Sequence, residues 1–195
     1  NKNFQPRRPS WSARCFGFAK CMIKTLIFDI GKVVMTTDFP TLYSNFAKRV
    51  GLEPEIVSTY HKQNIDAIML GQIDLAKFWT DMISFGANLH INMQQVWIEE
   101  GLKNRTTNHE LLTAINNWRG KYLVGTLTNV SQTRVLLDEQ NNLYSNFDFC
   151  LLSCREHLQK PDPKFYQLAL KVGGSLPEQA IFIDDKKNSS QQREI

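Results

Sequence analysis

Acidic side chains follow two of the apolar runs in this 195-residue chain, at the points where those runs end. Asp29 follows the first run, and the pair Asp184 and Asp185 follows the last. Carboxylates brought together repel one another unless a cation holds them ionised, and Mg²⁺ prefers carboxylate, carbonyl and water oxygens. We therefore interpret Asp29, Asp184 and Asp185, together with the carbonyl group of Gly31, as ligands of a Mg²⁺ ion.

Three further polar residues suit the same chemistry. Thr128 and Asn129 follow another apolar run, and Lys160 stands just before a predicted helix. Thr128 and Asn129 are candidates for binding a phosphoryl oxygen, and Lys160 can offset the charge of a phosphate and of the aspartates. Asp29 then becomes a reasonable nucleophile, forming an aspartyl-phosphate that water hydrolyses. Taken singly, such residues are more often helix caps or surface charges, so the prediction depends on their meeting at one site.

The elements that bring these residues together are the strands of a predicted parallel sheet. Apolar runs that favour strands lie at residues 23–28, 122–127, 149–152 and 180–183. Amphipathic stretches between the later runs predict helices after Asn108, from Ser131 to about Gln140, and from Pro163 to Val172. Alternating strands and helices are typical of a parallel sheet covered on both faces, with its ligand site at the carboxyl ends of the strands.

A long segment between the first strand and the second has a different periodicity. From about residue 40 to 103 the apolar residues recur at helical spacing, with Asp74 as a predicted N-cap. Gly86 and Gly101 are expected to interrupt the helices. This segment predicts an all-helical insertion into the α/β domain.

Four short motifs resemble those of the haloacid dehalogenase superfamily, in the same order. They are Leu26-Ile27-Phe28-Asp29-Ile30-Gly31-Lys32-Val33-Val34, Gly125-Thr126-Leu127-Thr128-Asn129, Lys160-Pro161-Asp162-Pro163-Lys164-Phe165-Tyr166, and Ile181-Phe182-Ile183-Asp184-Asp185. The insertion resembles the C1 cap of that superfamily, and Gly71-Gln72-Ile73-Asp74 is similar to a turn common in it. Each motif is weak alone, but together they cover nearly the whole chain.

The resemblance implies a Rossmann-like α/β fold with an inserted helical cap of the C1 type. It predicts a leader at residues 1–21, disordered or non-native, a core domain at 22–36 and 107–195, and a cap at 37–106. The Asp-x-Gly opening is closest to small-molecule phosphatases of the superfamily, including sugar-phosphate phosphatases. It implies Mg²⁺-dependent hydrolysis of a small phosphorylated metabolite, with Asp29 and Lys160 as catalytic residues and Thr128 and Asn129 binding substrate.

The sequence departs from the superfamily pattern at two places. Most phosphatases of the superfamily carry a second aspartate, the general acid and base, where this chain has Gly31. General acid catalysis is worth about 10²- to 10⁴-fold, so a slow enzyme is expected. The chain also stops ten residues after Asp185, so the C-terminal strand of the family sheet is expected to be missing.

Composition narrows the class of protein. The net charge of +4 comes from residues 1–21, which hold five basic and no acidic side chains, whereas the remainder has 18 basic and 19 acidic ones. A nearly neutral domain predicts no nucleic-acid partner. Four cysteines in irregular positions predict reduced thiols rather than disulfides or zinc, and no apolar run is long enough to span a membrane. A cytoplasmic monomer or homodimer is expected.

Three alternatives remain open. One is a metal-free 2-haloacid dehalogenase in which Asp29 attacks carbon, although such a site gains nothing from three clustered carboxylates. Another is a receiver-like phosphate sensor, although receivers place the paired acids before the phosphorylated aspartate. The last is a catalytically weak or silent binding protein, which the glycine at position 31 makes conceivable.

Overall fold

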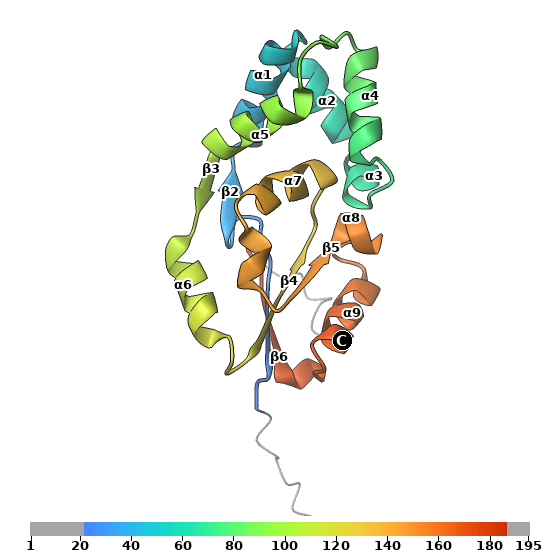
Figure 1. Ribbon diagram of the computed structural model, residues 1–195. Helices are drawn as coiled ribbons and strands as arrows, with labels where there is room; N and C mark the ends of the chain where they lie inside the picture. Colours follow the sequence, from blue (N-terminus) through green and yellow to red (C-terminus); the bar gives the residue numbers. More distant parts are fainter. Residues whose placement is uncertain (1–21, 187–195) are drawn as a thin grey trace, which may run out of the picture.

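A four-stranded parallel sheet forms the centre of the computed structural model, which describes residues 22–186 (Figure 1). The strand order is β5-β4-β1-β6, and every neighbouring pair is parallel. The strands are β1 (Thr25–Phe28), β4 (Leu123–Thr128), β5 (Phe149–Leu152) and β6 (Ala180–Ile183). The predicted parallel α/β sheet is therefore confirmed, and the observed strand ends lie within two residues of the predicted ones.

The middle of the sheet is β1, which is buried along its whole length between β4 and β6. Strands covered on both faces are continuously apolar, and the sequence of β1 follows that rule apart from Thr25. The Thr25 hydroxyl is buried and hydrogen-bonds to the carbonyl of Gly173 at 3.1 Å, which satisfies its polar group. Asp29 follows directly, so the central strand delivers it to the carboxyl edge of the sheet.

Helices cover both faces of the sheet (Figure 1). On one face α6 (His109–Trp118) contributes Ile115 to a core with Leu26 and Phe28. On the other, α9 (Pro163–Val172) contributes Phe165 and Ala169. The remaining elements of this layer are α7 (Gln132–Gln140), α8 (Ser153–Glu156) and the 3₁₀ turns η1 (Leu143–Asn146) and η2 (Pro177–Gln179).

A second, all-helical layer is formed by the segment between β1 and β4. Its helices are α1 (Phe39–Val50), α2 (Pro54–Gln63), α3 (Ile65–Met69), α4 (Leu75–Ser84) and α5 (Met93–Lys103). They enclose a core around Phe46, Phe78 and Trp97, in which the Trp97 ring lies 5.1 Å from that of Phe46 and 5.5 Å from that of Phe78 in edge-on contacts. Leu137 of α7 also belongs to this core, so the segment packs onto the sheet domain as a cap (Figure 1).

Two short antiparallel strands join the cap to the sheet domain. They are β2 (Met35–Thr37) and β3 (Arg105–Thr107), and Met35 pairs with Thr107. The sequence pattern did not predict this ribbon because three-residue strands carry no measurable periodicity. The chain therefore passes into and out of the cap through one paired ribbon.

Gly101 corrects an expectation from the sequence. It lies inside α5 instead of interrupting it, and a Cβ atom there would stand 2.5 Å from a methyl group of Leu137 in α7. The glycine permits close packing between the cap and α7, which outweighs its low helix propensity. Gly86, by contrast, follows α4 with a positive φ of 101°, as the sequence predicted for a break.

The cap lies at the carboxyl end of the sheet (Figure 1). The Ser153 hydroxyl donates to the Met69 carbonyl at 2.7 Å, and the Trp97 indole donates to the Thr133 carbonyl at 3.1 Å. These bonds tie α3 and α5 of the cap to α8 and α7 of the sheet domain. The predicted leader at residues 1–21 lies outside the described residues. Within residues 22–186 no helix has both the length and the apolar character required to cross a membrane.

Candidate active site

Asp29 stands at the carboxyl end of β1 and is 7% exposed. Its backbone N–H donates to the Ile183 carbonyl at 2.8 Å, which ties it to β6. Its carboxylate oxygen Oδ1 accepts a hydrogen bond from the Ile30 N–H at 2.8 Å. The other oxygen, Oδ2, lies on the side of Gly31. The backbone N–H of Ile30 thus orients the carboxylate through Oδ1, and Oδ2 takes no part in that hydrogen bond.

Lys160 joins Asp29 to Asp184. Its ammonium nitrogen lies 3.2 Å from Asp29 Oδ1 and 2.7 Å from Asp184 Oδ2, and its side chain is 10% exposed. The same nitrogen lies 5.3 Å from the centre of the Phe182 ring, a cation–π contact. Lys160 therefore lies beside the aspartates, at the position that the sequence predicted.

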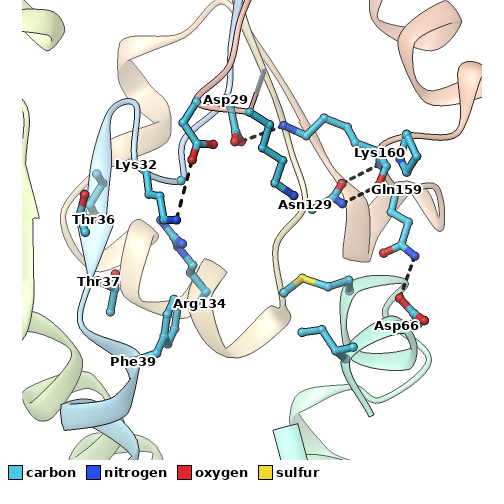
Figure 2. A pocket seen from close by; sticks show the side chains of 17 residues that line it. Asp29, Lys32, Thr36, Thr37, Phe39, Asp66, Asn129, Arg134, Gln159 and Lys160 are labelled. Carbon is cyan, nitrogen blue, oxygen red and sulfur yellow. Dashed lines mark hydrogen bonds and ion pairs between the residues drawn. The ribbon is translucent and has the colours of Figure 1, made fainter. Parts of the chain in front are cut away.

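Asn129 holds the backbone of Lys160. Its side-chain oxygen accepts from the Lys160 N–H at 2.7 Å, and its amide nitrogen donates to the Lys160 carbonyl at 2.9 Å (Figure 2). Both polar atoms of the Asn129 amide therefore position the backbone of Lys160. The sequence analysis interpreted Asn129 as a phosphate ligand and did not predict this contact. Thr128 is buried and does not belong to the cavity wall, and its role toward a phosphate stays a prediction.

The three aspartates form one cluster. One oxygen from each of Asp29, Asp184 and Asp185 lies within 4.8 Å of the others. Burial by itself raises the pKa of Asp184, but hydrogen bonds from the Lys160 ammonium and the Lys186 N–H outweigh burial and hold that pKa below its ordinary value. Asp184 is therefore ionised at neutral pH. Three hard oxygen donors so close together match the ligand preference of Mg²⁺.

A cavity of about 480 Å³ opens beside this cluster, between the sheet domain and the cap (Figure 2). Its wall is polar near the aspartates and partly apolar toward the cap. The residues that line it are Asp29, Gly31, Lys32, Met35, Thr36, Thr37, Phe39, Ile65, Asp66, Met69, Asn129, Arg134, Gln159, Lys160, Pro161, Asp185 and Lys186. Gln159 of the sheet domain donates to Asp66 of α3 at 3.2 Å, so the two layers meet across the cavity.

Three basic side chains of the cavity, those of Lys32, Arg134 and Lys186, were not singled out from the sequence. Arg134 projects from the first turn of α7 and is 12% exposed, and Lys32 lies 3.9 Å from Asp185. Arg134 sits in an ordinary helical stretch five residues after Asn129, which gives no local signal for a site.

Solved structures of known proteins share this architecture. A HAD family enzyme from Bacteroides thetaiotaomicron is 21% identical with a TM-score of 0.70, over 85% of this chain and 86% of that one. The same enzyme, in complex with magnesium and inorganic phosphate, gives a TM-score of 0.68 at 22% identity and the same coverage.

A third similar structure is a predicted HAD-like family hydrolase from Porphyromonas gingivalis, with a TM-score of 0.64 and 21% identity, over 85% of this chain and 83% of that one. No family model and no curated protein matches the sequence. The likeness is therefore one of fold. The chain has the fold of the haloacid dehalogenase superfamily.

Proposed function

We propose that this protein is a Mg²⁺-dependent phosphatase that hydrolyses small phosphate monoesters through an aspartyl-phosphate on Asp29. The observation that carries the proposal is the cluster of three aspartates within 4.8 Å of one another, bridged by Lys160. A buried lysine between two carboxylates, with a third alongside, is an arrangement that needs a further cation and suits an anionic substrate.

The donor set fits Mg²⁺. Asp29, Asp184 and Asp185 would hold the ion, with Gly31 beside them, because they offer only hard oxygen ligands. When bound, Mg²⁺ supplies positive charge that neutralises the phosphoryl oxygens and lowers the repulsion between the phosphate and Asp29. In support, the enzyme from Bacteroides thetaiotaomicron was crystallised in complex with magnesium and inorganic phosphate.

The residues of this chain then divide the reaction. Asp29 Oδ2 attacks phosphorus while the Ile30 N–H and Lys160 hold Oδ1, so the nucleophile is oriented before the reaction. The bond from phosphorus to the ester oxygen breaks with its electron pair on that oxygen, which takes a proton from water and leaves as the alcohol. Water then attacks the aspartyl-phosphate, which releases phosphate and restores Asp29. Lys160 stays in contact with Asp29 and Asp184 and offsets charge during both steps.

The cavity supports a small substrate. About 480 Å³ is within the range of small-molecule pockets, and the wall is shared between the sheet domain and the cap. Met69 and Ile65 of α3 stand on the cap side, so they are placed to contact the part of the molecule that leaves. We infer a small phosphorylated metabolite as the substrate, in keeping with the sugar-phosphate phosphatases that the first motif resembles.

The test is phosphate release from 4-nitrophenyl phosphate and from a panel of phosphorylated metabolites, with Mg²⁺ and with EDTA. The expected result is turnover that requires Mg²⁺ and that falls at least 10³-fold in Asp29→Asn. Asp74→Asn is the matched control, because it makes the same exchange at the N-cap of α4, where asparagine caps equally well. Its turnover should equal that of the original protein.

Two outcomes would contradict the proposal. Turnover of a 2-haloacid that persists in EDTA, with no phosphate release, would favour the metal-free dehalogenase. Phosphate release that is unchanged by Asp29→Asn would show that the activity does not come from this site.

A further inference from the structure

Arg134 lies at the edge of the cavity, between an aromatic ring and a buried carboxylate. Its guanidinium carbon lies 5.7 Å from the centre of the Phe39 ring, and its Nε lies 3.9 Å from Asp138 Oδ2. Asp138 is fully buried and also pairs with Arg105 and accepts from the Tyr144 hydroxyl at 2.8 Å. The Phe39 ring on one side and the buried Asp138 carboxylate on another limit where the guanidinium can lie. Its Nε and Nη2 atoms are buried without a hydrogen-bond partner among the described residues.

Of the two terminal nitrogens of this guanidinium, Nη1 is the one directed toward Gly31. A Cβ atom built on Gly31 would stand 3.9 Å from Arg134 Nη1 and 3.9 Å from Asp29 Oδ2. The nucleophilic oxygen and the guanidinium therefore flank the same small volume, no farther apart than twice that distance. A glycine at position 31 leaves this volume open.

The charges of the site balance when Arg134 is counted. Among the described residues, the cavity wall together with Asp184 holds four aspartates and four basic side chains, namely Asp29, Asp66, Asp184, Asp185, Lys32, Arg134, Lys160 and Lys186. Mg²⁺ adds two positive charges, and the dianion of a phosphate monoester brings two negative ones. The summed charge of these side chains, the Mg²⁺ ion and one phosphate monoester dianion is therefore zero. Arg134 contributes one of the positive charges that face the phosphoryl group.

The described residues around this volume include no general acid that could protonate the leaving group. In an in-line displacement the ester oxygen lies beyond phosphorus from the attacking oxygen and gains negative charge as its bond breaks. Gly31 offers no carboxylic acid to protonate it, and a guanidinium does not give up a proton in proteins. A guanidinium can, however, stabilise the charge by donating a hydrogen bond.

We propose that Arg134, through Nη1, binds the ester oxygen of the substrate and takes the place of the missing general acid by stabilising the charge of the leaving group. This inference rests on the proposed phosphatase function. Asp29 Oδ2 forms its bond to phosphorus, and the bond to the ester oxygen breaks with its electron pair remaining on that oxygen. Arg134 holds the resulting alkoxide until a water molecule protonates it, and the hydroxide formed is neutralised by the buffer.

A direct consequence is that Arg134 matters most for substrates whose leaving group is a poor one. Alkyl esters place nearly a full charge on the departing oxygen, whereas 4-nitrophenyl phosphate spreads that charge over its ring. Arg134→Gln should therefore reduce kcat by about 10²- to 10³-fold for an alkyl phosphate, the range for loss of a preorganised donor. For 4-nitrophenyl phosphate the reduction should be less than about tenfold.

The experiment measures kcat and KM over a series from 4-nitrophenyl phosphate through phenyl phosphate to an alkyl phosphate, with Mg²⁺. It compares the original protein, Arg134→Gln, Arg134→Lys and the control Arg155→Gln, whose side chain is exposed and pairs with Glu139 outside the cavity wall. Thermal unfolding and circular dichroism establish which variants are folded. If Arg134→Gln does not fold, Arg134→Lys decides, because it keeps the charge without the planar donor.

A reduction of kcat that grows as the leaving group becomes poorer, with Arg155→Gln unchanged, supports the inference. Equal reductions across the series, no reduction, or a rise in KM alone overturn it while leaving the phosphatase function in place. Absence of any Mg²⁺-dependent phosphate release by the original protein overturns both, and this result differs from the others because no variant is needed to see it.

Discussion

At the scale of single residues, the site combines one reactive oxygen with a fixed set of charges. Asp29 is oriented by a backbone N–H and by Lys160, and Gly31 leaves open the volume that Arg134 faces. Asp29 and Lys160 were predicted from the sequence because each lies in one of four motifs that follow the order of the superfamily. Arg134 belongs to no motif, and only its position in space connects it with the aspartates. The assigned roles of all these residues stay predictions.

A histidine of the cap gives a prediction about pH. His61 lies in α2 with its ring 5.2 Å from that of Tyr43 and 6.4 Å from that of Phe39, and burial lowers its pKa from 6.5 to about 4. Below pH 6.5 the unfolded chain binds a proton that the folded chain refuses, so the free energy of unfolding should fall as pH drops from 6.5 toward 4. The loss should reach up to about 3 kcal/mol, since each pKa unit is worth about 1.4 kcal/mol.

Urea unfolding between pH 4.5 and 8 would measure this. His61→Phe keeps an aromatic ring against Tyr43 and removes the titrating group, so its stability should depend less on pH in that window than that of the original protein. Equal slopes for the two proteins below pH 6.5 would mean that the acid sensitivity arises at other groups.

At the scale of elements, the turn between α3 and α4 fixes the cap against the sheet domain. Gly71 has a φ of 70°, and a Cβ atom there would stand 2.1 Å from the backbone oxygen of Cys154 in α8. The neighbouring Leu70 carbonyl lies 2.8 Å from His157 Nδ1. The sequence marked this turn by its likeness to a cap motif, but the contact with α8 explains why a glycine is needed there.

Gly71→Ala should therefore destabilise the protein more than an ordinary glycine exchange. The left-handed backbone costs alanine about 1 kcal/mol, and the clash with a backbone carbonyl should add about 1 to 3 kcal/mol. Gly51→Ala is the matched control, because Gly51 has a φ of 83° with no atom within 4 Å of its Cβ position. Urea unfolding of both variants measures the difference, and equal losses would mean that the contact with Cys154 relaxes at no cost.

Gly101 and the β2–β3 ribbon illustrate the limit of reading elements from sequence. The strands of the sheet were predicted because buried parallel strands are short, apolar and bounded by turns. Gly101 was misread as a break because helix propensity is local, whereas its actual neighbour is Leu137, 36 positions away. The ribbon was missed because its strands, Met35–Thr37 and Arg105–Thr107, are stabilised by pairing with each other rather than by their own composition.

At the scale of the whole molecule, the aspartate cluster joins two distant segments of the chain. Asp29 follows β1, Asp184 and Asp185 follow β6, and one oxygen from each lies within 4.8 Å of the others. Binding of Mg²⁺ to the folded state alone raises its stability, by about 2.7 kcal/mol when the free ion is at a hundred times its dissociation constant. The melting temperature should therefore rise with Mg²⁺ and return to its original value with EDTA.

Asp185→Asn removes one ligand and should reduce this shift at a given Mg²⁺ concentration, while Asp74→Asn should keep it. Thermal unfolding with NaCl at matched ionic strength separates binding from general screening. A shift of the same size in Asp185→Asn, or in NaCl alone, would exclude the three aspartates as the cause.

The sequence by itself determined the fold class, the helical cap and the aspartates at the ends of β1 and β6. These follow from local patterns, since apolar runs predict buried strands and parallel strands bring their carboxyl ends to one edge. Only the tertiary structure decided that Asn129 holds Lys160, that Arg134 faces Gly31 across from Asp29, and that Gly101 packs against Leu137. Those contacts join residues whose separation in the chain carries no periodic signal. The first two join loops and helices of the sheet domain, and the third packs the cap onto α7.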